Sequence, residues 1–138
     1  MMKHQILILD DDVTRFSLFT KLIGNDYDSS YTAESFLASI RKGEIVADTL
    51  MLDHDLGSGL NGTGMAKAIR DEKLQLPTVK RILIHSNNTV GGTNMLMILQ
   101  EAFPDMTIKL FPTSQINDVW EELGRDKIAL RNFILSIQ

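Results

Sequence analysis

Four short apolar runs, and a fifth that is more polar, alternate along the chain with stretches whose apolar residues recur at helical spacing. The apolar runs are short and continuous, as in strands that are buried on both faces. This alternation predicts a parallel sheet covered by helices on both faces. The predicted strands cover residues 5–9, 27–33, 48–53, 79–86 and 106–111, and the predicted helices cover residues 13–23, 36–43, 64–74, 93–103 and 114–124.

Five strand–helix units fit an α/β fold of the flavodoxin-like type, a doubly wound five-stranded parallel sheet with strand order 2-1-3-4-5. We expect this domain to span residues 1–123. The spacing of apolar residues within 124–138 predicts an extra C-terminal amphipathic helix that is not preceded by a strand of its own. This extension either covers the sheet or contacts a partner, for example in a homodimer. The predicted helix caps are Thr32 or Ser35, Thr93, and Thr113 or Ser114.

Composition limits the functions that are open to the chain. A length of 138 residues predicts one domain, and a formal net charge of −4 gives no basic surface for broad nucleic-acid binding. The absence of cysteine excludes disulfides and thiolate metal sites. The first apolar run has five residues and is followed by three acids, so it is too short and too acidic for a signal peptide or a membrane span. We therefore expect a cytoplasmic protein.

Polar residues follow three of the predicted strands at the point where each strand ends. The chain reads LDDD at 9–12, LDHD at 52–55 and IHSN at 84–87. Strands 1, 3 and 4 are neighbours in the predicted sheet, so Asp10, Asp11 and Asp53 are expected to meet at one edge. Carboxylates this close repel one another unless a cation neutralises them, and oxygen ligands favour magnesium or manganese. The alternative is that these acids only cap the helices that follow.

The two histidines at the strand ends admit two interpretations. If Asp53 and Ser86 face the predicted site, alternation along a strand turns His54 and His85 toward the packed faces of the sheet. There each is a hydrogen-bonded core histidine. At a frayed strand end, either can instead carry a proton during hydrolysis of a phosphate ester. Gly64 and the loop at 87–94 lie at the starts of helices, where backbone amides can hold a phosphate.

The stretches ILILDDD, LMLDHDLG and ILIHSN resemble the pattern of receiver domains of two-component response regulators, whose fold is CheY-like, over about residues 4–123. The resemblance implies a phosphate-accepting aspartate at Asp53. It also implies a metal site of the acidic pair Asp10 and Asp11, of Asp53, and of Asp55 through its backbone carbonyl. It implies that Ser86 contacts the phosphoryl oxygens, with Asn87 and Gly64 as further phosphate contacts. Receivers also place a lysine before a proline at the end of strand 5. In this chain Lys109 can occupy the position of that lysine only if Leu110 replaces the proline. If Pro112 is aligned with the proline of receivers, Phe111 stands at the position of the lysine.

A narrower resemblance rests on LDHDLG, the following GTG, and HSNNTVGGTNM. These stretches are similar to the receiver-like family named for predicted cyclic-phosphate processing. This resemblance implies a metal-dependent enzyme that hydrolyses a cyclic phosphate, with Asp53, Ser86, His54, His85 and Lys109 as candidate catalytic residues. The expected cofactor is magnesium or manganese.

Three functions follow as hypotheses. The first is a metal-dependent domain that handles a small phosphorylated ligand, of the cyclic-phosphate processing type. The second is a single-domain response regulator in a phosphorelay, in which a phosphodonor phosphorylates Asp53 and the surface signals to a protein partner. The third is a receiver-shaped interaction protein without turnover.

Overall fold

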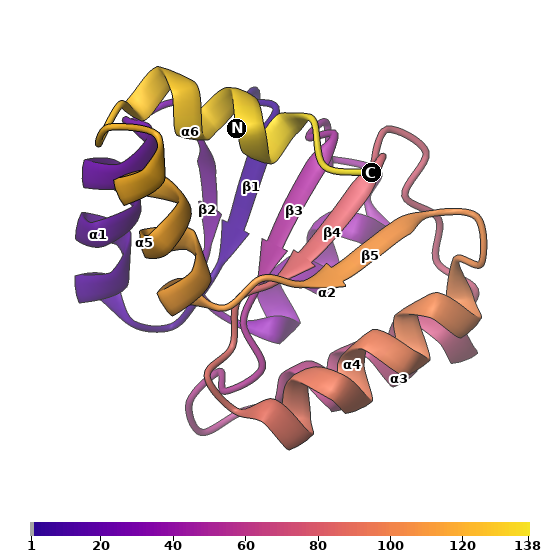
Figure 1. Cartoon of the computed structure of the whole chain (residues 1–138). Coiled ribbons are helices and arrows are strands. Elements are labelled where there is room, and N and C mark those ends of the chain that lie inside the picture. Colours follow the sequence, from indigo (N-terminus) through magenta and orange to yellow (C-terminus); the bar gives the residue numbers. More distant parts are fainter. Residues whose placement is uncertain (1) are drawn as a thin grey trace.

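The computed structural model describes residues 2–138 and contains one five-stranded parallel sheet in the order β2-β1-β3-β4-β5. The predicted fold class and strand order are therefore confirmed. Figure 1 shows the strands running side by side, with helices on both faces. The strands are β1 (Ile6–Leu9), β2 (Asp28–Ser30), β3 (Thr49–Leu52), β4 (Arg81–Ile84) and β5 (Thr107–Leu110).

The register of the strands determines which residues meet where the strands end. Leu9 pairs with Leu52, Leu52 with Ile84, and Ile84 with Leu110. The residues that follow these four, one on each strand, are therefore level with one another. We call this end of the sheet, where the parallel strands finish, the carboxyl edge. The four level residues are Asp10, Asp53, His85 and Phe111. Three backbone hydrogen bonds continue the sheet to this level: Asp53 N–H donates to Leu9 O, His85 N–H to Leu52 O, and Phe111 N–H to Ile84 O.

The helices form two layers, one on each face of the sheet. The first layer holds α1 (Val13–Ile23), α5 (Thr113–Glu122) and α6 (Lys127–Leu135), and the second holds α2 (Ala33–Arg41), α3 (Gly62–Asp71) and α4 (Thr89–Ala102). Every strand residue of β1, β3 and β4 is buried, as expected for strands covered on both sides. The two helix layers therefore enclose two apolar cores, separated by the sheet.

The C-terminal helix packs on the same face of the sheet as α1 and α5. Leu130 and Ile134 of α6 are fully buried in the same core as the inward face of α1. Beyond α6, Arg81 of β4 donates from Nε to the backbone oxygen of Ile137, at 2.9 Å. The predicted extra helix is therefore present, and it covers the sheet. No helix among residues 2–138 is long and apolar enough to cross a membrane.

Two of the predicted helix caps are wrong. Helix α4 begins at Thr89, four residues before the predicted cap Thr93, and Asn88 caps it by accepting from the N–H of Gly91. Helix α5 begins at Thr113 directly after Pro112, without a side-chain cap. Thr32 caps α2 as one of the two predicted alternatives.

Candidate functional site

Three buried polar side chains meet at the carboxyl edge. Asp10, Asp53 and His85 each offer one atom that could bind a metal, and these atoms all lie within 4.8 Å of one another. Their exposed fractions are 0%, 2% and 0%. We call these three residues the edge cluster. Residue types of this kind could hold a divalent cation, because two carboxylates and an imidazole are common metal ligands.

His85 belongs to this cluster, and it is also the buried, hydrogen-bonded histidine on a packed face that was one of the two interpretations of the sequence. The prediction placed Asp53 and Ser86 on the same face of the sheet. The register instead places Asp53 level with His85, so the side chains of Asp53 and His85 lie on the same face. Nε2 of His85 lies 3.0 Å from Oδ2 of Asp10. The ring also packs edge-on against Phe19 of α1, with centroids 5.1 Å apart. Alternation along one strand could not reveal this, because it does not give the register between strands.

Arg15 of α1 also lies at the edge cluster, and the sequence reasoning missed it. Its Nε is 2.9 Å from Oδ2 of Asp10, and its Nη2 is 3.6 Å from Oδ2 of Asp53 and 3.7 Å from Oδ2 of Asp12. The signal was available, because a cation in the first turn of a helix is opposed by the helix dipole and needs another reason to be there. The guanidinium brings a fixed positive charge to the buried carboxylates.

The environment of Asp53 favours its neutral form. Burial raises the pKa of Asp53 above its ordinary value, and the negative charge of Asp10 adds to this effect. His85 and Arg15 act in the opposite direction. Oδ1 of Asp53 accepts the N–H of His54 at 2.8 Å, whereas Oδ2 is buried and has no hydrogen-bond partner within residues 2–138. An unpartnered carboxylate oxygen in a buried site is available to a ligand.

His54 is held by hydrogen bonds at both ring nitrogens. Nδ1 lies 2.8 Å from Oδ1 of Asp55, and Nε2 lies 2.9 Å from Oγ1 of Thr63 on α3. A Cβ placed on Gly91 of α4 would lie only 2.5 Å from Cε1 and Nδ1 of the ring. His54 is buried, and in this structure it joins the end of β3 to the starts of α3 and α4. This arrangement matches the hydrogen-bonded core histidine that the sequence left as one alternative.

The other two acids predicted as metal ligands are exposed at the same edge. Asp55 accepts from His54 and, at 3.2 Å, from Nδ2 of Asn88, and these two bonds hold its pKa below the ordinary value. Asp11 extends toward the β3–α3 loop, where a Cβ placed on Gly57 would lie 3.3 Å from its Oδ2. The described part of the chain brings neither carboxylate into the edge cluster, and metal binding through the backbone carbonyl of Asp55 stays a prediction.

The residues predicted to contact phosphate lie at a different position. Ser86 and Asn87 line a pocket of about 270 Å³ between the starts of α4 and α5. Oγ of Ser86 accepts the N–H of Asn88 at 3.0 Å. The N–H of Gly64 donates to its own helix cap, Asn61, at 2.8 Å. These groups are used locally in the structure.

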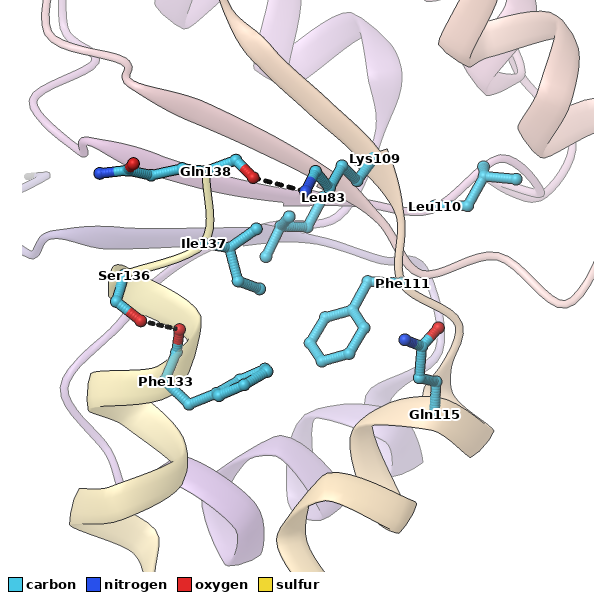
Figure 2. Close-up of a pocket in the computed structure, with 9 residues that line it drawn as sticks. All are labelled: Leu83, Lys109, Leu110, Phe111, Gln115, Phe133, Ser136, Ile137 and Gln138. Atoms are coloured by element: carbon cyan, nitrogen blue, oxygen red, sulfur yellow. Dashed lines mark hydrogen bonds between the residues drawn. The ribbon is translucent and has the colours of Figure 1, made fainter.

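Lys109 lies two residues before the carboxyl edge, where it pairs with Leu83 in the register. Its Nζ donates to the backbone oxygen of Gln138. Figure 2 shows this lysine at a pocket of about 320 Å³ between β5 and the end of α6, with the rings of Phe111 and Phe133 lining it. Of the two alternatives for the end of strand 5, the structure brings Phe111, and not Lys109, level with His85.

The architecture is similar to that of several solved receiver structures. The receiver domain of NtrX from Brucella abortus is 17% identical, covering 90% of this chain and 98% of its own, with a TM-score of 0.52. A response regulator receiver protein from Pseudomonas putida is 14% identical, covering 91% and 99%, with a TM-score of 0.57. A CheY-like receiver domain protein from Methanospirillum hungatei JF-1 is 17% identical, covering 94% and 97%, with a TM-score of 0.54.

These comparisons show a CheY-like fold. None of the curated proteins compared with the chain matches it. The model of the family called cyclic-phosphate processing receiver domain matches residues 5–101, which is more than half of the chain. The chain belongs to this family.

Proposed function

We propose that this receiver domain hydrolyses a small cyclic phosphate with the help of a divalent cation bound at the edge cluster. The observation that carries the proposal is the meeting of Asp10, Asp53 and His85 within 4.8 Å, beside the guanidinium of Arg15. Two buried carboxylates this close repel one another, and a cation bound beside them relieves that repulsion. The family name supports the cyclic phosphate as the substrate class.

The residues fit a divalent cation by their chemistry. Oδ2 of Asp53 and Nδ1 of His85 are buried and lack hydrogen-bond partners in the described chain. A bound cation would neutralise the carboxylates and the phosphate and would lower the pKa of a water molecule. Magnesium and manganese are the ions that the sequence predicted.

Arg15 is the protein's own contribution to charge neutralisation. Its guanidinium already approaches Asp53, so a phosphate bound at Asp53 would meet a fixed positive charge that is able to make two parallel hydrogen bonds. In the proposed reaction, a water oxygen attacks phosphorus and one ring P–O bond breaks. The leaving alkoxide takes up the proton that the water loses, and the product is a phosphomonoester.

The test is a panel of five- and six-membered cyclic phosphodiesters incubated with the full chain and Mg²⁺, Mn²⁺ or a chelator. Phosphorus NMR follows the appearance of the monoester. We expect turnover of at least one compound with the metal, and a loss of about 10²-fold or more in Asp53→Asn, because the substitution removes the charge that holds the cation. Asp118→Asn, at an exposed acid on α5, is the matched control and keeps full activity.

Turnover that persists in the chelator, or in Asp53→Asn, would contradict the proposal. Absence of turnover across the panel, together with absence of metal binding in a calorimetric titration, would favour the receiver-shaped interaction protein instead.

A second function is favoured by one observation, the unpartnered Oδ2 of Asp53 at the place where a nucleophile is needed. In this alternative the carboxylate attacks a phosphodonor, the P–O bond to the donor's leaving group breaks, and an acyl phosphate forms. Incubation with acetyl phosphate and Mg²⁺, followed by intact-mass measurement, tests it. An added phosphoryl group that is absent in Asp53→Asn supports a phosphorelay role. An unmodified mass excludes phosphorylation by this small donor.

A further inference from the structure

The two ring nitrogens of His85 have very different surroundings. Nε2 lies 3.0 Å from the carboxylate of Asp10, whereas Nδ1 is buried and has no hydrogen-bond partner within residues 2–138. An ionised carboxylate can only accept a hydrogen bond, so Nε2 carries the proton and donates it to Asp10. Nδ1 then keeps its lone pair. The hydrogen bond to Asp10 thereby fixes both the tautomer and the orientation of the ring.

Asp10 already has partners for both of its oxygens. Oδ1 accepts the N–H of Asp12 at 2.9 Å. Oδ2 lies between Nε2 of His85 and Nε of Arg15, at 3.0 and 2.9 Å. An incoming cation would have to displace one of these contacts from a residue that is fully buried. Asp10 is therefore better suited to hold His85 and Arg15 in place than to bind the cation itself.

The unused lone pairs of the edge cluster belong to two other atoms, Nδ1 of His85 and Oδ2 of Asp53. Both atoms are buried without a hydrogen-bond partner in the described chain, and buried polar atoms of this kind point to a ligand that satisfies them. A lone pair on nitrogen and one on oxygen are both satisfied by a cation. A histidine that binds a metal through one nitrogen commonly donates its other N–H to a carboxylate, which is the arrangement of Asp10 and His85.

We propose that His85 binds the catalytic cation through Nδ1 together with Oδ2 of Asp53, while Asp10 acts as the positioning residue for the imidazole. The inference rests on the proposed function for the presence of a cation. It replaces an all-oxygen magnesium site with a mixed nitrogen and oxygen site. Imidazole favours ions such as Zn²⁺ and Fe²⁺, whereas Mg²⁺ prefers oxygen ligands. The site therefore selects a transition-metal ion over Mg²⁺.

Nitrogen NMR of the full chain tests this assignment without relying on activity, with Zn²⁺ as the probe. The sequence contains three histidines, and the variants His4→Gln and His54→Gln assign the spectrum by elimination. In the metal-free protein we expect the Nε2 of His85 to show the shift of a protonated nitrogen and Nδ1 that of a bare one. Zn²⁺ should move the Nδ1 resonance of His85 and leave the rings of His4 and His54 unchanged.

Binding affinities provide the second readout. We expect Zn²⁺ to bind at least about tenfold more tightly than Mg²⁺, and His85→Gln to remove this preference. Asp10→Asn should retain the Zn²⁺-dependent shift of Nδ1 while weakening binding by about 10–100-fold, the usual effect of losing a carboxylate that orients a metal-binding histidine. If His85→Gln does not fold, the wild-type spectrum alone decides the question.

Two results would overturn the inference. One is a His85 ring protonated on Nδ1 in the metal-free protein. The other is Zn²⁺ or Mg²⁺ binding that leaves the His85 resonances unchanged. Metal-dependent hydrolysis accompanied by unchanged His85 resonances would leave the proposed function standing and refute only the nitrogen ligand. Absence of binding by any of these ions would refute both.

Discussion

The close contact between Gly91 and the ring of His54 leads to a quantitative prediction. In Gly91→Ala, the new Cβ would lie 2.5 Å from two ring atoms and 2.6 Å from a third. The ring cannot move aside freely, because hydrogen bonds to Asp55 and Thr63 hold both of its nitrogens. The substitution must therefore either strain the packing or break at least one of these bonds.

The expected change in the free energy of unfolding follows from three contributions. Overpacking a well-packed site costs about 1–3 kcal/mol. A broken hydrogen bond adds about 0.5–1.5 kcal/mol, and the higher helix propensity of alanine returns up to about 1 kcal/mol. We expect a net loss of about 1–3 kcal/mol for Gly91→Ala. At roughly 3–4 °C per kcal/mol for a domain of this size, the midpoint falls by about 3–12 °C.

The neighbouring glycine provides the matched control in a urea-unfolding experiment. A Cβ on Gly92 of α4 would meet its nearest neighbour at 3.5 Å, which is an ordinary contact, so Gly92→Ala should stabilise by about 0.4–1 kcal/mol. In the background of His54→Ala, the loss caused by Gly91→Ala should largely disappear, since the ring is gone. A Gly91→Ala protein that is as stable as Gly92→Ala would refute the reasoning.

Three further predictions concern charged side chains. In metal-free buffer at pH 7, Asp53→Asn should raise the urea midpoint, because burial raises the pKa of Asp53 and its ionised form opposes folding. This gain should shrink as the pH falls toward 3.8, the ordinary pKa of an aspartate, and an unchanged midpoint at pH 7 would contradict the prediction. Arg81→Leu should lower the free energy of unfolding by about 2–3 kcal/mol, because a buried, charged hydrogen-bond donor to the backbone of Ile137 is lost. Lys109→Met removes an exposed donor and should change this free energy by less than about 0.5 kcal/mol. Equal losses in the two variants would be inconsistent with their difference in burial. Arg15→Gln should weaken the binding of inorganic phosphate by about tenfold, as measured by calorimetry, and Arg15→Lys should restore only part of the lost affinity. A phosphate affinity of Arg15→Gln equal to that of the wild type would show that Arg15 does not contribute to phosphate binding.

The fold was predictable because its main signals are local. The apolar runs at β1, β3 and β4 are continuous and short, and each corresponds to a strand buried on both faces. The start of α4 was not predictable from propensity. Gly91 and Gly92 argue against a helix, yet α4 runs through both, and the missing Cβ of Gly91 lets the helix pass close to the ring of His54. Tertiary packing there outweighs the intrinsic preference of glycine.

The candidate site was predictable in its place but only partly in its members. Apolar strands that end in acids indicate a shared edge, and Asp10 and Asp53 do meet there. The side on which His85 lies depends on the register between β3 and β4, which no single stretch of sequence specifies. A cation in the first turn of a helix was a signal for Arg15, but its relation to Asp53 exists only after α1 packs on the sheet.

The two outermost strands have a consequence for how the protein behaves at high concentration. One of them, β2, has three residues of the sequence DSS, and the other, β5, presents an exposed lysine. Short or charged border strands are poor templates for a strand from a second molecule. The sheet is thus protected against growing into fibrils at its open borders, even though its interior strands are almost entirely aliphatic.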